Sequence, residues 1–122
     1  MRDGVVSAAL EVVEIAEVAP LLARGAQPHW SEQELAYARS KSDPERRLAA
    51  RLAAKRAVLR LLGAGLATSD AEVRRARGAP PLLLLSERAQ ERLRALGAER
   101  VLVSLSHGRT HAAASVLLLA AR

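Results

Sequence analysis

Two periodicities in the hydrophobic positions predict a mixture of helices and strands. The clearest helical pattern is 48–65, LAARLAAKRAVLRLLGAG, which contains no proline and no glycine before its last three residues. Leu48, Leu52, Leu59 and Leu62 recur at three-, four- and seven-residue spacings, as on one face of a helix. We expect this segment to form the longest helix, ended by its two glycines, and the rest of the chain to be organised around it.

Before this helix, the pattern predicts one strand and one helix near the N-terminus. Valine and alanine favour a short strand around 4–9. Glu11, Glu14 and Glu17 lie at helical spacing, so a helix is expected to begin at about residue 10 and to stop at Gly25. Pro20 would kink or break that helix.

Two further helix starts are marked by local signals. Ser31 and Glu34 predict a capping box, and Trp30 and Leu35 stand where a hydrophobic staple would place them, so a helix should run to about residue 40. The segment SDPE at 42–45 predicts the start of the long helix, with its serine and glutamate forming a second box.

The second half of the chain reads mostly as strands. Segments 71–76 and 82–85 are expected to be strands, the second one buried, with a tight turn at 77–81 between them. Ser86 should cap a helix over 87–96 that ends at Gly97. Segments 101–106 and 111–119 should pair as a hairpin.

Composition narrows the class of protein. The chain has 122 residues, half of them hydrophobic, so one domain over 1–122 is expected, with an aliphatic core because Trp30 and Tyr37 are the only aromatic residues. A small core of this kind favours oligomerisation. There is no cysteine, no run long enough to span a membrane and no signal-peptide pattern, which together predict a soluble, cytoplasmic protein.

The charge pattern points to an anionic partner. The formal net charge is +6, and the long helix carries Arg47, Arg51 and Lys55 in one row and Arg56 and Arg60 in another. Like charges at this spacing repel, so such rows are consistent with a bound anion. Composition alone favours the simpler interpretation, a solvated helix face. The residues themselves therefore indicate a small basic α+β domain and leave its ligand open.

Recognisable catalytic motifs are absent. The sequence contains no HExxH, Walker A or GxGxxG pattern, and its three histidines form no metal-binding set. A nucleic-acid-binding domain is the alternative that the charge allows, and it is disfavoured because stacking aromatic residues are missing.

Four segments, in order, resemble the holo-[acyl-carrier-protein] synthase family of small 4′-phosphopantetheinyl transferases. EVVEI at 11–15 is similar to the family's DIVEI, and RLAAKRAVLR at 51–60 with LGAG at 62–65 is similar to RFAAKEAxxKAxGTG. GAP at 78–80 resembles the GKP turn, and VSLSHGRTHAAA at 103–114 resembles VSLSHSxxxAxA. The second and fourth segments together are specific, and the resemblance covers nearly the whole chain.

The resemblance implies an α+β fold, in which a small antiparallel sheet packs on a long central helix. It implies that the protein binds coenzyme A and Mg²⁺ and transfers the 4′-phosphopantetheine arm to a serine of an acidic apo acyl carrier protein, releasing 3′,5′-ADP for fatty acid biosynthesis. Family members are typically homotrimers with the CoA site between subunits. The residues that match the family's pattern are Glu11 and Lys55 as catalytic groups, and Arg51, Lys55, Arg56, Arg60, Gly78, Pro80, Ser106, His107 and Arg109 as CoA-binding groups.

The metal site departs from the family. Its two ligand positions, an aspartate and a glutamate, are here Glu11, which still can bind a cation, and Arg56, which repels one. Three interpretations follow: the protein is a weak or inactive relative that binds CoA or carrier protein without Mg²⁺-dependent transfer; Arg56, held by Glu11, supplies the positive charge itself; or Arg56 points away. Glu17 also replaces an arginine of the family's carrier-docking helix, whose charge Arg24 would retain in part.

Overall fold

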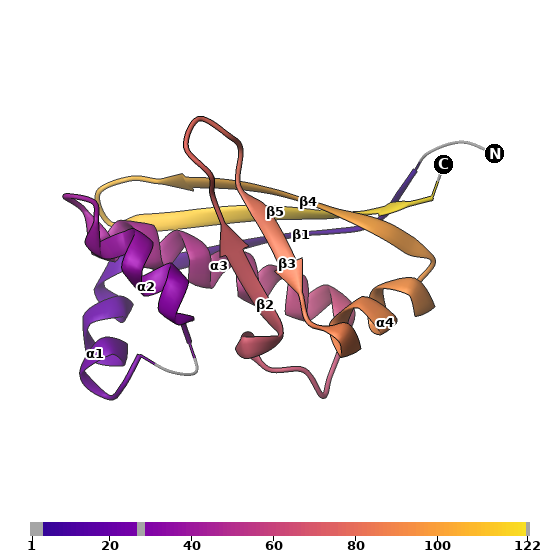
Figure 1. Cartoon of the computed structure of the whole chain (residues 1–122), viewed down its shortest axis with the longest axis horizontal. Coiled ribbons are helices and arrows are strands. Elements are labelled where there is room, and N and C mark those ends of the chain that lie inside the picture. Colours follow the sequence, from indigo (N-terminus) through magenta and orange to yellow (C-terminus); the bar gives the residue numbers. More distant parts are fainter. Residues whose placement is uncertain (1–3, 27–28, 122) are drawn as a thin grey trace.

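The long central helix is the element on which the other elements pack. In the computed structural model, which describes residues 4–26 and 29–121, α3 (Pro44–Leu62) lies against a sheet made of β1 (Val5–Glu14), β5 (His111–Ala120) and β4 (Ala98–His107), in that order. All pairings are antiparallel, with Glu11 opposite Ala114 and His107 opposite Ala112. This sheet on a long helix confirms the predicted fold class (Figure 1).

Shorter elements cover the rest of α3. The hairpin of β2 (Ala71–Arg74) and β3 (Leu82–Leu85) crosses in front of the long strands, and its loop projects beyond them (Figure 1). At one end of α3 lie a 3₁₀ turn (Ile15–Glu17), α1 (Val18–Ala23) and α2 (Glu32–Arg39). At the other end lie a second 3₁₀ turn (Thr68–Asp70) and α4 (Glu87–Ala95). Because α3 is enclosed on several sides, most of its residues from Leu48 to Val58 are buried.

Two of the three predicted helix caps are confirmed. Ser31 and Glu34 form the predicted capping box of α2, and Trp30 is fully buried, where its indole nitrogen donates to the carbonyl of Leu48 at 2.9 Å. Ser86 caps α4 as expected. The box predicted between Ser42 and Glu45 is wrong: Asp43 precedes the helix without a side-chain cap, and its carboxylate pairs with Arg47 at 3.0 Å.

The N-terminal prediction needs the largest correction. The strand does not stop near residue 9 but continues to Glu14, so Glu11 and Glu14 lie in β1 and not on a helix. The strand is this long because β5, which has ten residues, pairs with it along its length. Side chains alternate between the two faces of a strand, so Glu11 and Val13 point toward α3 while Leu10 and Val12 face away. Pro20 does not kink a helix, because it lies in the first turn of α1, where its missing N–H is not needed.

One strand differs in its burial. The strand over 82–85 is confirmed, but it is not buried, since Leu82 and Leu84 are 60% and 40% exposed. The two-stranded sheet has only one face against the core, so alternate leucines of β3 point outward.

Candidate active site

The central helix contributes a buried ion pair where the pattern favoured a solvated face. Lys55 and Glu34 are each 1% exposed, and the Lys55 ammonium contacts the Glu34 carboxylate at 2.5 Å and the carbonyl of His29 at 3.0 Å. Glu34 also accepts hydrogen bonds from the backbone N–H groups of Ser31 and Val73, both at 2.8 Å. This carboxylate therefore joins α2, α3 and β2, and the solvated-face interpretation is wrong for Lys55.

Arg51 lies one turn before Lys55 and faces a pocket of about 330 Å³ between α2, α3 and the β2–β3 hairpin. Its guanidinium stacks on the Tyr37 ring at 4.1 Å and is 2% exposed, and its Nε finds no hydrogen-bond partner among the described residues. Burial lowers the pKa of Arg51, whereas Tyr37 and Glu34 raise it. A buried cation with an unused donor is the kind of group that a bound anion would satisfy.

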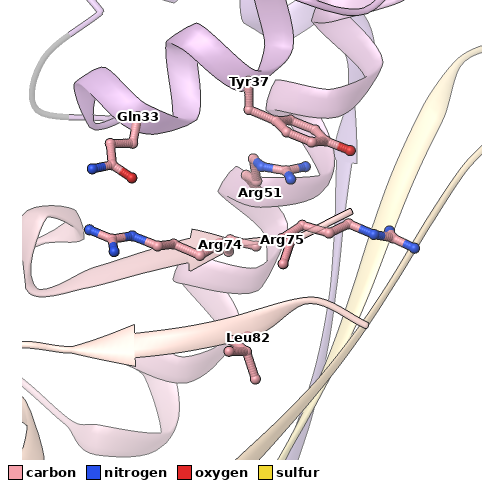
Figure 2. Close-up of a pocket in the computed structure, with 8 residues that line it drawn as sticks. Gln33, Tyr37, Arg51, Arg74, Arg75 and Leu82 are labelled. Carbon is pink, nitrogen blue, oxygen red and sulfur yellow. The ribbon is translucent and has the colours of Figure 1, made fainter. Parts of the chain in front are cut away.

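Further cations surround this pocket. Figure 2 shows Tyr37 above Arg51, with Arg74 and Arg75 extending in opposite directions from the neighbouring strand end. A second, adjoining hollow is lined by Tyr37, Lys41, Arg75 and Gly78 among others, so the predicted turn glycine lies beside the Arg51 pocket. Pro80 lies in the same exposed loop.

A second region lies at the turn between β4 and β5. Ser106 and His107 are the last residues of β4, Arg109 lies in the turn that follows, and all three residues are exposed. His107 Nε2 lies 3.9 Å from the Asp43 carboxylate at the start of α3, and Arg109 lines a hollow of about 500 Å³ with Asp43 and Arg46. Arg47 lowers the pKa of Asp43 by donating a hydrogen bond to its carboxylate.

The third region is where the resemblance would place a metal ion. Glu11, Arg56 and Arg60 line one open pocket of about 510 Å³. Arg60 contacts the Glu11 carboxylate at 2.9 Å and donates to the Leu10 carbonyl at 2.9 Å, whereas Arg56 contacts Glu17 at 3.1 Å. Arg56 is therefore paired with Glu17 and not with Glu11, whose carboxylate is held by Arg60.

These side chains do not fit a divalent cation. Across residues 4–26 and 29–121, no three histidine, cysteine, aspartate or glutamate side chains are grouped so that they could hold a metal ion. Glu11 and Glu17 are each already paired with a guanidinium, and a cation between them would be repelled by Arg56 and Arg60. These residues therefore favour an anion over Mg²⁺.

Within one chain the predicted site residues fall into three regions that share no lining residue. The sequence did not single out Glu34 as a partner of Lys55, nor Tyr37 and Arg75 as pocket residues. The capping signal identified Glu34 only as a helix-start residue, and nothing local indicates a lysine partner 21 positions away.

Comparison with known proteins identifies the family, although no protein-family model matches the sequence. The chain is 40% identical to the holo-[acyl-carrier-protein] synthase of Moorella thermoacetica over 92 residues, which covers 73% of this chain and 72% of that protein. It is 31% identical to the enzyme of the same name from Koribacter versatilis, over 89% of this chain and 94% of that protein.

A solved structure shows the same fold. A holo-(acyl-carrier-protein) synthase from Bacillus anthracis, crystallised in complex with CoA (3′,5′-ADP), aligns with a TM-score of 0.76 at 24% identity, over 96% of this chain and 98% of that one. Both relatives carry the same name, and each alignment covers most of both proteins. The chain therefore belongs to the holo-[acyl-carrier-protein] synthase family.

Proposed function

We propose that this protein transfers the 4′-phosphopantetheine group of coenzyme A to a serine of an apo acyl carrier protein, in support of fatty acid biosynthesis. The observation that carries the proposal is the 40% identity to a holo-[acyl-carrier-protein] synthase over 73% of the chain. The positive net charge of +6 suits both an anionic nucleotide and an acidic carrier protein.

In this proposal the nucleotide end of CoA binds at the Arg51 pocket. Arg51 offers a buried guanidinium with an unused Nε donor, and Arg75 and Lys41 add charge at the adjoining hollow beside Gly78. Guanidinium groups bind phosphate oxygens through paired hydrogen bonds. Lys55 has a structural role here, because its ammonium is already occupied by Glu34 and by the carbonyl of His29.

The chemical step is a substitution at phosphorus. The hydroxyl oxygen of the carrier serine forms a bond to the pantetheine-side phosphorus of CoA. The bond from that phosphorus to the bridging oxygen breaks, and the bridging oxygen leaves on 3′,5′-ADP with the bonding electrons. The serine proton is lost, and Glu11 is the carboxylate in the pocket with Arg56 and Arg60 that can accept it.

A homotrimer completes the site in this proposal. The face of the long sheet that points away from α3 exposes apolar side chains, including Leu10, Val12 and Leu102 at 62%, 54% and 47%. Apolar surface of this kind is typical of an interface. A neighbouring subunit packed there could bring its His107 and Arg109 toward the Arg51 pocket, which the single chain leaves apart. Light scattering coupled to gel filtration, with Leu10→Arg as the disrupting variant, measures the assembly.

The proposal places the protein in the cytoplasm. Within the part of the chain that the structure describes, no helix is both apolar enough and long enough to cross a bilayer.

The transfer assay decides the proposed function. Purified protein is incubated with CoA and a cognate apo carrier protein, with and without EDTA, and the carrier is analysed by intact-mass spectrometry. A carrier whose acceptor serine is changed to alanine is the control. We expect a mass gain of one phosphopantetheine on the serine carrier only, and a large loss of rate in Arg51→Leu. CoA binding without any transfer would contradict the proposal and identify a non-catalytic family member.

A further inference from the structure

Arg56 occupies the position of a metal ligand in the family pattern, and Arg60 lies one turn further along α3. Arg56 and Arg60 are four residues apart on α3, and both line the open pocket that also contains Glu11. Each is held by a single carboxylate, Arg56 by Glu17 and Arg60 by Glu11, so the nearby acidic groups are already neutralised.

The end of α3 beside this pocket does not present its usual negative charge. The last carbonyl groups of a helix repel anions. Here the Arg92 guanidinium of α4 donates to the carbonyls of Leu62 and Ala64, both at 2.9 Å. Gly63 and Ala64 line the same pocket as Arg56, so a third guanidinium lies just behind its wall. The local charges therefore favour an anion over a cation.

The two arginines differ in how firmly they are held. Arg60 makes two contacts with β1, to the Glu11 carboxylate and to the Leu10 carbonyl. Its side chain is 57% exposed, but its partner Glu11 is only 22% exposed, so its two contacts hold it better than one exposed ion pair would. Arg56 makes one ion pair among the described residues, and both its side chain and that of Glu17 are substantially exposed, at 38% and 42%. Exposed ion pairs of this kind are weak, so a phosphate group of higher charge can displace Glu17 from Arg56.

We propose that Arg56 and Arg60 form a metal-independent clamp for the diphosphate of CoA. Because Arg60 lies on the opposite face of α3 from Arg51, the nucleotide of the clamped CoA would enter the Arg51 pocket of a neighbouring subunit. This inference rests on the proposed function and deepens it. The planar guanidinium groups bind the non-bridging oxygens of the diphosphate, and Arg56 exchanges Glu17 for the ligand when CoA enters. During transfer they stabilise the charge that develops on the bridging oxygen as it leaves with 3′,5′-ADP.

Calorimetric titration of CoA into the whole protein tests the clamp, first in EDTA and then in excess MgCl₂. We expect the two dissociation constants to agree within about twofold, because no ion is part of the site. Arg56→Gln should weaken CoA binding by about ten- to a hundredfold, the loss typical of a hydrogen bond to a charged group. Arg94→Gln, which removes the same charge from an exposed position on α4, is the matched control and should change binding little.

The reverse substitution gives a second, independent readout. Arg56→Glu places a second carboxylate beside Glu11, and this variant should bind CoA poorly in EDTA and recover affinity when Mg²⁺ is added. Arg94→Glu controls for the change in net charge and should show no such recovery. Circular dichroism melting curves of each variant establish that the protein remains folded.

The outcomes separate this inference from the proposed function. CoA binding that requires Mg²⁺ in the unaltered protein, or that is insensitive to Arg56→Gln, would overturn the clamp and leave the transferase proposal intact. Arg56-dependent binding without transfer to the carrier would support the clamp and refute the transferase. Failure to bind CoA in either buffer would overturn both.

Discussion

Replacing Lys55 by methionine tests whether this lysine is structural. The substitution keeps an unbranched side chain of similar length and removes the ammonium from a site that is 1% exposed. The Glu34 carboxylate would keep its two backbone donors but lose the ammonium paired with it. Removing one member of a buried ion pair costs about 3–5 kcal/mol, a large fraction of the roughly 5–15 kcal/mol stability of a typical domain.

The expected loss is measurable by urea unfolding and by thermal melting. For a chain of this size, about 3–5 kcal/mol corresponds to a fall in melting temperature of roughly 10–20 °C. Protein concentration must be held fixed, because subunit association would shift the midpoint. Lys41→Met is the matched control: it removes the only other lysine, which is exposed and lies over the Tyr37 ring, and should cost less than about 1 kcal/mol.

A double-variant cycle with Glu34→Gln isolates the pair. The combined variant buries two neutral groups, so it should be more stable than the sum of the single losses by about 1–3 kcal/mol. If Lys55→Met instead left stability unchanged and abolished CoA binding, Lys55 would be a ligand-binding residue and the structural role argued for it would be refuted.

Two further predictions concern Asp70 and Gly63. Hydrogen bonds from Arg88 and Ser86 hold the pKa of Asp70 far below its usual 3.8. The ionised carboxylate therefore stabilises the fold fully above about pH 4, and this stabilisation is lost as the pH falls further. Urea unfolding at several pH values should show that Asp70→Asn is less stable than the unaltered protein at neutral pH, and that the difference shrinks below about pH 4. Gly63 has a φ of +100°, and a Cβ there would lie 3.2 Å from the Arg92 guanidinium. Gly63→Ala should therefore cost about 1–3 kcal/mol of unfolding free energy, and a Gly108→Ala control, at a residue without a positive φ, should cost less.

Features that depend on neighbours in sequence were predictable. The capping box of Ser31 and Glu34, the cap at Ser86 and the end of α1 near Gly25 all follow from backbone groups within one turn of the side chain that satisfies them. The hairpin of β4 and β5 was predictable for the same reason, since a short turn brings its two apolar segments together.

Features that depend on distant partners were not. The spacing of Glu11, Glu14 and Glu17 fits a helix, and only the edge of β5, about a hundred residues away, makes a strand the better solution for the first two. Likewise, Arg51 and Lys55 have the spacing of a solvated helix face. They are buried because α2 and β2 pack over that face and bring Tyr37 and Glu34 to them.

The sequence by itself determined α2, α3 and α4, the family resemblance and the replacement of a family metal ligand by Arg56. Propensity, capping and motif identity are local properties, and they can be read along the chain. Only the tertiary structure decided which charges meet: Lys55 with Glu34, Arg60 with Glu11, and Arg56 with Glu17. An ion pair depends on distance and burial, and both are set by how separate segments pack against α3.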